Sequence, residues 1–171
     1  MNLTKIVAKW PVVKRWSVAP AAVVWCAPGT RLRVGEGVTT RRGCKIQDCV
    51  DLRDHVAIEA WASIGPGAYV GTGANIGHKT KIGAHAYIGD HAYIYDYVRI
   101  GRHVFIGPST RVAEGAVIGA DTHVGAGVII GDHATISAGT VIGDNSVLSQ
   151  DATIGSEAAR GWMLAKSESQ S

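Results

Sequence analysis

Aliphatic side chains recur at every sixth residue through most of this chain. From Val34 to Ile154, 21 positions lie six residues apart, and 20 of them hold Ile, Val or Leu, with Thr40 as the exception. We call these the core positions. The residue four places after each core position is Ala, Val, Thr, Ser or Cys in all 21 cases, and no insertion breaks the register. A period of six does not match the 3.6-residue period of a helix and indicates short strands joined by tight corners.

The composition agrees with strands and sets outer limits on function. Ile and Val together number 35, against 5 Leu. β-branched side chains fit a pleated surface and are stiff in helices, so a helical bundle is excluded. A net charge of +3 is too small to indicate a nucleic-acid partner. No apolar run is long enough for a transmembrane segment. The three cysteines form no CxxC pair, and we therefore expect a cytoplasmic protein.

Three consecutive six-residue units account for one triangular coil of 18 residues. Residues 34–159 then make seven coils, stacked at the strand spacing of ~4.8 Å. This pattern resembles that of the hexapeptide-repeat acyltransferase superfamily, whose fold is a left-handed parallel β-helix. The handedness is implied by the resemblance, because periodicity alone does not show it. We therefore predict an all-β protein, a left-handed parallel β-helix of about seven regular coils with no inserted loop.

The ends of the chain depart from the repeat. We expect an N-terminal cap segment at residues 1–17, the β-helix at residues 18–159 with an irregular opening coil, and a C-terminal tail at residues 160–171. The first segment has one apolar helical face that ends at Pro11, and such a cap would cover edge strands that are otherwise exposed. The alternative is a segment rich in Lys and Trp that lies on a membrane surface.

The glycines follow the same phase as the core positions. Thirteen come directly after a core position and seven come three places after one. The second phase is a corner where the chain needs positive φ, which glycine adopts readily and which Asn, Asp and His adopt more often than other residues. We therefore interpret five histidines at this phase as turn residues without a chemical role: His55, His85, His91, His103 and His133.

Residues 18 apart stack above one another, so the outward positions form three columns. One column carries an aromatic series: Tyr69, Tyr87, Phe105 and His123. An exposed apolar strip of this length indicates a partner. We expect a second copy of the chain, and the resemblance implies a homotrimer, through Tyr69, Tyr87 and Phe105. The alternative is a stacking platform for a ligand. Another column is basic, with Lys45, Lys81 and Arg99.

Two histidines lie outside the turn phase: His123, which ends the aromatic column, and His78. His78 comes two places after a core position, in the string Ile-Gly-His-x-Thr-x-Ile-Gly that begins at Ile76. This string is similar to the catalytic turn of hexapeptide acyltransferases that act on UDP-sugars and amino sugars. The resemblance implies that His78 is the general base, with an oxyanion donor one coil away in the Tyr95–Asp96 backbone. Asp96 and Glu114 continue the column of His78, as supporting carboxylates.

The same resemblance implies a co-substrate and an acceptor. The donor would be an acyl-CoA or an acyl carrier protein, with no permanently bound cofactor and no metal. The acceptor would be a small molecule with a hydroxyl or an amine. The basic residues Lys79, Lys81 and Arg99 would face the phosphates of the donor. The alternative is a non-catalytic trimeric rod that serves as a scaffold or spike, which the unbroken coils also fit.

A second resemblance is to the γ-class carbonic anhydrases, which share the fold. The segment Ile46-Gln47-Asp48 looks like part of their Asn-Ile-Gln-Asp sequence, and His78 matches their second metal ligand. The first and third ligand positions fall on Arg53 and Gly83, which implies a degenerate zinc site. A separate hypothesis is a metal site at the stacked residues His85, His103 and Asp121.

Overall fold

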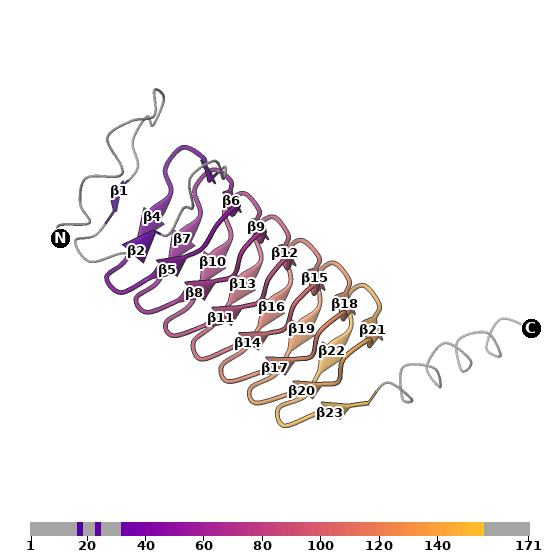
Figure 1. Ribbon diagram of the computed structural model, residues 1–171. Helices are drawn as coiled ribbons and strands as arrows, with labels where there is room; N and C mark the ends of the chain where they lie inside the picture. The colour runs from indigo at the N-terminus through magenta and orange to yellow at the C-terminus, as the bar shows by residue number, and fades with distance from the viewer. Residues whose placement is uncertain (1–16, 19–22, 25–31, 156–171) are drawn as a thin grey trace, which may run out of the picture.

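The computed structural model describes residues 17–18, 23–24 and 32–155 and contains 23 strands of two residues each, with no helix among these residues. The strands form three parallel sheets that stack coil upon coil into a triangular rod (Figure 1). Sheet A contains β1 (Ser17–Val18), β4 (Thr39–Thr40), β7 (Ala57–Ile58), β10 (Asn75–Ile76), β13 (Tyr93–Ile94), β16 (Arg111–Val112), β19 (Ile129–Ile130) and β22 (Val147–Leu148).

The other two sheets continue each coil. Sheet B contains β2 (Val23–Val24), β5 (Lys45–Ile46), β8 (Ser63–Ile64), β11 (Lys81–Ile82), β14 (Arg99–Ile100), β17 (Val117–Ile118), β20 (Thr135–Ile136) and β23 (Thr153–Ile154). Sheet C contains β3 (Arg33–Val34), β6 (Asp51–Leu52), β9 (Tyr69–Val70), β12 (Tyr87–Ile88), β15 (Phe105–Ile106), β18 (His123–Val124) and β21 (Val141–Ile142). The prediction of an all-β protein, built as a parallel β-helix of about seven 18-residue coils without an inserted loop, is confirmed.

The register is constant except in the first coil. Paired residues in the regular coils are 18 apart, as Asn75 is from Tyr93. In the opening coil Ser17 pairs with Thr39 and Val23 pairs with Lys45, an offset of 22. Four extra residues therefore lie between β2 and β3, in a stretch outside the described residues. This is the irregularity expected of the opening coil.

The core positions and their small partners fill the rod. Every core position from Thr40 to Ile142 is buried, and so is every small partner from Val38 to Thr140. Stacked Ile and Val side chains from successive coils therefore make one continuous core. Thr40, the polar exception, is also buried, and its hydroxyl has no hydrogen-bond partner among the described residues. An unmatched buried hydroxyl lowers stability, so this coil is a weak point of the core.

The corner phase adopts the predicted backbone conformation. Positive φ occurs at 7 glycines and 13 other residues, all of them three places after a core position. All five turn histidines are in this set, with φ between 53° and 59°. The interpretation of these histidines as turn residues is confirmed, and turn geometry accounts for them without any chemistry.

The corner glycines also provide space, which the repeat alone did not predict. At six of the seven positive-φ glycines, an added Cβ would contact the side chain of the residue 18 places later. At Gly73 the added Cβ would lie 2.6 Å from Nδ1 of His91. A ring in one coil therefore folds over a glycine in the coil before it, and the pair is complementary in size.

Gly73→Ala is expected to destabilise the protein more than Gly139→Ala. Both glycines have positive φ, 67° and 69°, so both substitutions carry a backbone cost of roughly 1–2 kcal/mol. Only the alanine at 73 meets a neighbour, because nothing lies within 4 Å of an added Cβ at Gly139. The midpoints of thermal unfolding of the two variants measure the difference in stability. Adding His91→Ala to the Gly73→Ala variant should remove this difference, because the ring that meets the new Cβ is then absent. Equal midpoints for the two single variants would contradict this account.

The predicted N-terminal cap, apart from Ser17, and the C-terminal tail lie outside the described residues. Within the described residues, the structure contains no helix with the length and hydropathy to cross a membrane.

Candidate active site at the corner between sheets A and B

A pocket of about 260 Å³ lies at the corner where the chain leaves sheet A for sheet B. We call this the A–B corner. Three carboxylates and two tyrosines are among the residues that line the pocket, which are Glu59, Asn75, Gly77, Tyr93, Tyr95, Asp96 and Glu114. The predicted residues Tyr95, Asp96 and Glu114 therefore line one hollow, directly beside His78.

Gly77, which has no side chain, is one of the residues that line the pocket. The column directly after the core positions of sheet A reads Glu59, Gly77, Tyr95 in successive coils. A Cβ at Gly77 would lie 2.5 Å from the carbonyl oxygen of Tyr95, so only glycine fits there. The side chains above and below Gly77 become walls. The rings of Tyr93 and Tyr95, 4.4 Å apart between centroids, form an aromatic side of the pocket.

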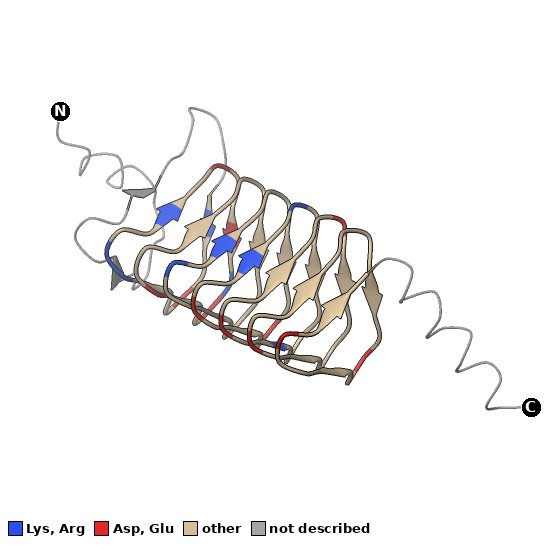
Figure 2. Cartoon of the chain, turned by 90° about the horizontal axis from the view of Figure 1, so that it is seen from below, with Lys and Arg blue, Asp and Glu red and all other residues tan. Residues whose placement is uncertain are grey.

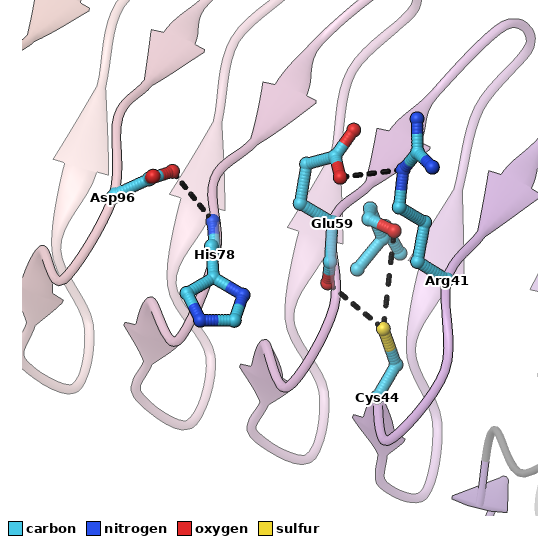
Figure 3. A network of polar contacts seen from close by, with 6 residues as sticks. Arg41, Cys44, Glu59, His78 and Asp96 are labelled. Atoms are coloured by element: carbon cyan, nitrogen blue, oxygen red, sulfur yellow. Dashed lines mark hydrogen bonds and ion pairs between the residues drawn. The ribbon is translucent and has the colours of Figure 1, made fainter.

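His78 is held through its backbone. Its N–H donates to Oδ1 of Asp96 at 2.7 Å, and its carbonyl accepts from the N–H of Tyr97 at 2.9 Å. The imidazole packs edge-on against the Tyr97 ring, with 5.8 Å between centroids and an interplanar angle of 83°. Figure 3 shows the His78 ring turned away from the Asp96 carboxylate. The side chain is half-buried and lies beside the pocket without lining it.

The hydrogen bond that the Asp96 carboxylate accepts from a backbone N–H recurs along this rod. Aspartates 18 residues later accept the corner N–H of the preceding coil in four further places: Asp54 with Glu36, Asp90 with Thr72, Asp132 with Glu114, and Asp144 with Ala126. The alignment of Asp96 with His78 follows from the repeat, as predicted. No hydrogen bond joins the His78 imidazole to the Asp96 or Glu114 carboxylate among the described residues.

The two backbone amides of the predicted oxyanion donor differ. The N–H of Tyr95 donates to the carbonyl of Val112 at 2.9 Å, whereas the N–H of Asp96 has no partner among the described residues. The hydroxyl of Thr80 donates to the Tyr95 carbonyl at 2.7 Å and fixes the peptide that carries the Asp96 N–H. A fixed N–H beside a pocket is the kind of donor that stabilises an oxyanion.

Sequence reasoning missed Glu59, Asn75 and Tyr93. Glu59 is paired with Nε of Arg41 at 2.5 Å, and its carbonyl accepts from the thiol of Cys44 at 3.0 Å (Figure 3). Burial raises the pKa of the Cys44 thiol, which fits a neutral core residue rather than a nucleophile. Asn75 and Tyr93 could have been found from the sequence, because residues 18 apart stack and these two lie one above the other on sheet A.

The aromatic column on sheet C forms a continuous stack. Ring centroids lie 4.6 Å apart for Tyr69 and Tyr87, 4.8 Å for Tyr87 and Phe105, and 4.5 Å for Phe105 and His123, with interplanar angles of 2°, 7° and 3°. The guanidinium of Arg53 caps the stack, 5.3 Å from the Tyr69 centroid. Desolvation between its neighbours raises the pKa of Tyr87. The stack turns ring edges outward along one flat face of the rod.

The described residues contain no group of three or more His, Cys, Asp or Glu that is placed to hold a metal ion. Nδ1 of His103 lies 3.1 Å from Oδ1 of Asp121, and the His85 ring stacks on His103 at 5.5 Å. Arg53 is engaged with Tyr69 and Asp51, and Gly83 has no side chain that could be a ligand. The residues proposed for a zinc site of the carbonic anhydrase kind do not come together within this chain.

Comparison with known proteins agrees with the repeat. The family described as bacterial transferase hexapeptide (six repeats) matches residues 62–96, 79–114, 97–132 and 109–144. The chain belongs to the hexapeptide-repeat superfamily, whose fold is the left-handed parallel β-helix. No protein of curated function matches the sequence.

Several solved structures are similar in part. PerB from Caulobacter crescentus, in complex with CoA and GDP-perosamine, is 29% identical over 81% of this chain and 55% of that one, with a TM-score of 0.31. UDP-N-acetylglucosamine acyltransferase from Bacteroides fragilis is 15% identical over 77% of this chain and 66% of that one, with a TM-score of 0.49. This chain therefore spans half to two thirds of the length of these proteins. Likenesses of this strength say nothing about its substrate.

Proposed function

We propose that this protein is an acyltransferase that moves an acetyl or longer acyl group from CoA or an acyl carrier protein to a hydroxyl or an amine. The observation that carries the proposal is the pocket at the A–B corner, which adjoins His78 and the free N–H of Asp96. Membership of the hexapeptide family supports it.

The proposed chemistry uses these groups in sequence. A neutral imidazole of His78 takes the proton of the acceptor as its oxygen or nitrogen attacks the thioester carbonyl. The Asp96 N–H donates to the oxyanion that forms on the carbonyl oxygen. When the tetrahedral intermediate collapses, the carbon–sulfur bond breaks and the thiolate takes the proton back from His78. The products are the acylated acceptor and a free thiol.

Asp96, Glu114 and the two pocket tyrosines have supporting roles in this proposal. Asp96 holds the backbone N–H of His78, and both carboxylates line the pocket next to the histidine. Tyr93 and Tyr95 supply flat apolar walls against which an acceptor can pack.

The test is transfer itself. The full-length protein is incubated with acetyl-CoA, and separately with acyl groups on a carrier protein, against a panel of amino and hydroxy sugars, and thiol release is followed. Acceptor-dependent release supports the proposal. If no pair of donor and acceptor reacts and no CoA binding is measurable, the unbroken rod is better explained as a non-catalytic scaffold.

We further propose that the chain forms a homotrimer through the sheet C stack. Tyr87→Ser/Phe105→Ser is expected to convert the assembly to monomers, because it removes the two central rings and their apolar area. Light scattering during gel filtration measures the mass. The control Tyr93→Ser/Ile129→Ser removes two exposed apolar side chains from sheet A. An unchanged mass for the first variant would refute the assignment.

A further inference from the structure

The outward face of sheet B carries positive charge and no negative charge. Lys45 on β5, Lys81 on β11 and Arg99 on β14 are all exposed. The remaining outward residues of the described column are Ser63, Val117, Thr135 and Thr153. None of the ion pairs between described residues involves these three cations. In Figure 2 the basic strands gather toward the N-terminal half of this sheet.

The register places two of these charges side by side. Lys81 pairs directly with Arg99 on the neighbouring strand, at the ~4.8 Å spacing of a sheet. Like charges in directly opposite positions are destabilising. Ser63, which occupies the same column next to Lys81, shows that the fold accepts a small neutral residue there. The cations are therefore not needed for the fold, and an external negative charge would relieve their repulsion.

An aromatic rim borders this basic face. The corner column that precedes the sheet B strands contains Trp61, Lys79 and Tyr97 in three successive coils. Trp61 is 55% exposed and Tyr97 is 47% exposed, and Nζ of Lys79 lies 5.3 Å from the Tyr97 centroid. The corner carboxylates Asp96 and Glu114 belong to the pocket on the sheet A side. Trp and Tyr beside Lys and Arg are typical of surfaces that meet the polar region of a bilayer.

Charge is also distributed unevenly along the chain. Residues 1–102 contain 14 basic and 7 acidic residues, a net charge of +7, whereas residues 103–171 contain 3 basic and 7 acidic residues, a net charge of −4. Residues 1–16 alone contain four Lys or Arg and two Trp. The positive half of the chain is thus the half that carries the basic face.

We propose that the basic face of sheet B, formed by Lys45, Lys81 and Arg99 with the rim of Trp61, Lys79 and Tyr97, docks on an anionic lipid surface. A flat, rigid face of this kind presents its cations in one plane, as a layer of lipid headgroups requires. Each Lys or Arg near such a surface strengthens binding by about fivefold, so the contact is reversible and depends on salt. This inference goes beyond the acyl transfer proposed above and does not depend on it.

The test compares two double variants with the same change in net charge. Lys81→Ser/Arg99→Ser removes two cations from the face and places there the residue found at Ser63. The control Arg102→Ala/Arg111→Asn removes two cations elsewhere and uses residues found in the same columns, at Ala84 and Asn75. Full-length proteins are sedimented with vesicles of phosphatidylcholine alone and of phosphatidylcholine mixed with phosphatidylglycerol. Circular dichroism melting verifies that all variants are folded.

Wild type is expected to bind only the phosphatidylglycerol vesicles and to be released by salt. The face variant should bind the vesicles roughly 10- to 30-fold more weakly than wild type. The control variant should bind at most about two- to threefold more weakly. Three results would overturn the proposal: no binding to anionic vesicles at low salt, equal weakening in both variants, or face-dependent binding to heparin or an acidic protein without binding to vesicles. Acyl transfer measured without vesicles tests the enzyme proposal separately.

Discussion

Replacing His78 with alanine is expected to lower the rate of acyl transfer by about 10²- to 10⁴-fold, the usual contribution of a general base. The fold should be unaffected, because the hydrogen bonds that hold this corner are made by the backbone of His78 rather than by its ring. Ala60 occupies the same column in the preceding coil and shows that alanine fits there. Steady-state thiol release with a fixed donor and acceptor measures the effect.

The matched control is His91→Asn. His91 is a turn histidine with φ of 56°, and Asn145 shows that asparagine serves at the same phase with φ of 58°. This variant should keep the wild-type rate, because a turn histidine has only a conformational role. If His78→Ala retains full activity while thiol release still depends on the acceptor, His78 is not the base. A comparable loss in both variants would instead indicate a general effect on the fold.

Replacing a core isoleucine is expected to have the largest effect on stability. Ile106→Ala should lower the free energy of unfolding by about 2–5 kcal/mol, since it leaves a cavity in a column where every neighbour is an aliphatic of a stacked coil. The stacked coils cannot close the gap, because the backbone hydrogen bonds between them set their spacing. Urea unfolding followed by circular dichroism measures the change.

Val141→Ala on the same sheet is the control for this substitution. Val141 points outward and is 47% exposed, so its replacement should cost less than about 0.5 kcal/mol in an isolated chain. A loss at Ile106 as small as that at Val141 would mean that the core tolerates cavities, contrary to the packing described above. The two variants also separate the inward and outward phases of the repeat within one sheet.

The fold was predictable to the level of individual strands because each contact repeats at a fixed separation. The core position, its small partner and the corner residue each keep one environment, so Ile58 and Ile94 predict the burial of Ile76 between them. The opening coil was predictable only as an irregularity. Its offset of 22 depends on residues that do not follow the repeat.

The candidate site was predictable in part. Counting by 18 placed Asp96 above His78 and placed the aromatic residues of sheet C in one stack, and the structure contains both arrangements. It did not show that the Asp96 carboxylate would bind the backbone N–H rather than the imidazole. Counting by 18 also did not show that Glu59, Gly77 and Tyr95 would line one pocket.

By itself, the sequence determined the coil, its register, the direction of each side chain and the columns on each face. These follow from a strict local period, in which every residue meets neighbours at known separations along the chain. Only the tertiary structure decided which atoms meet at the A–B corner, where a hollow remains, and which N–H is left free beside it. Those features depend on the shapes of non-repeating side chains from four adjacent coils, and a period contains no information about them.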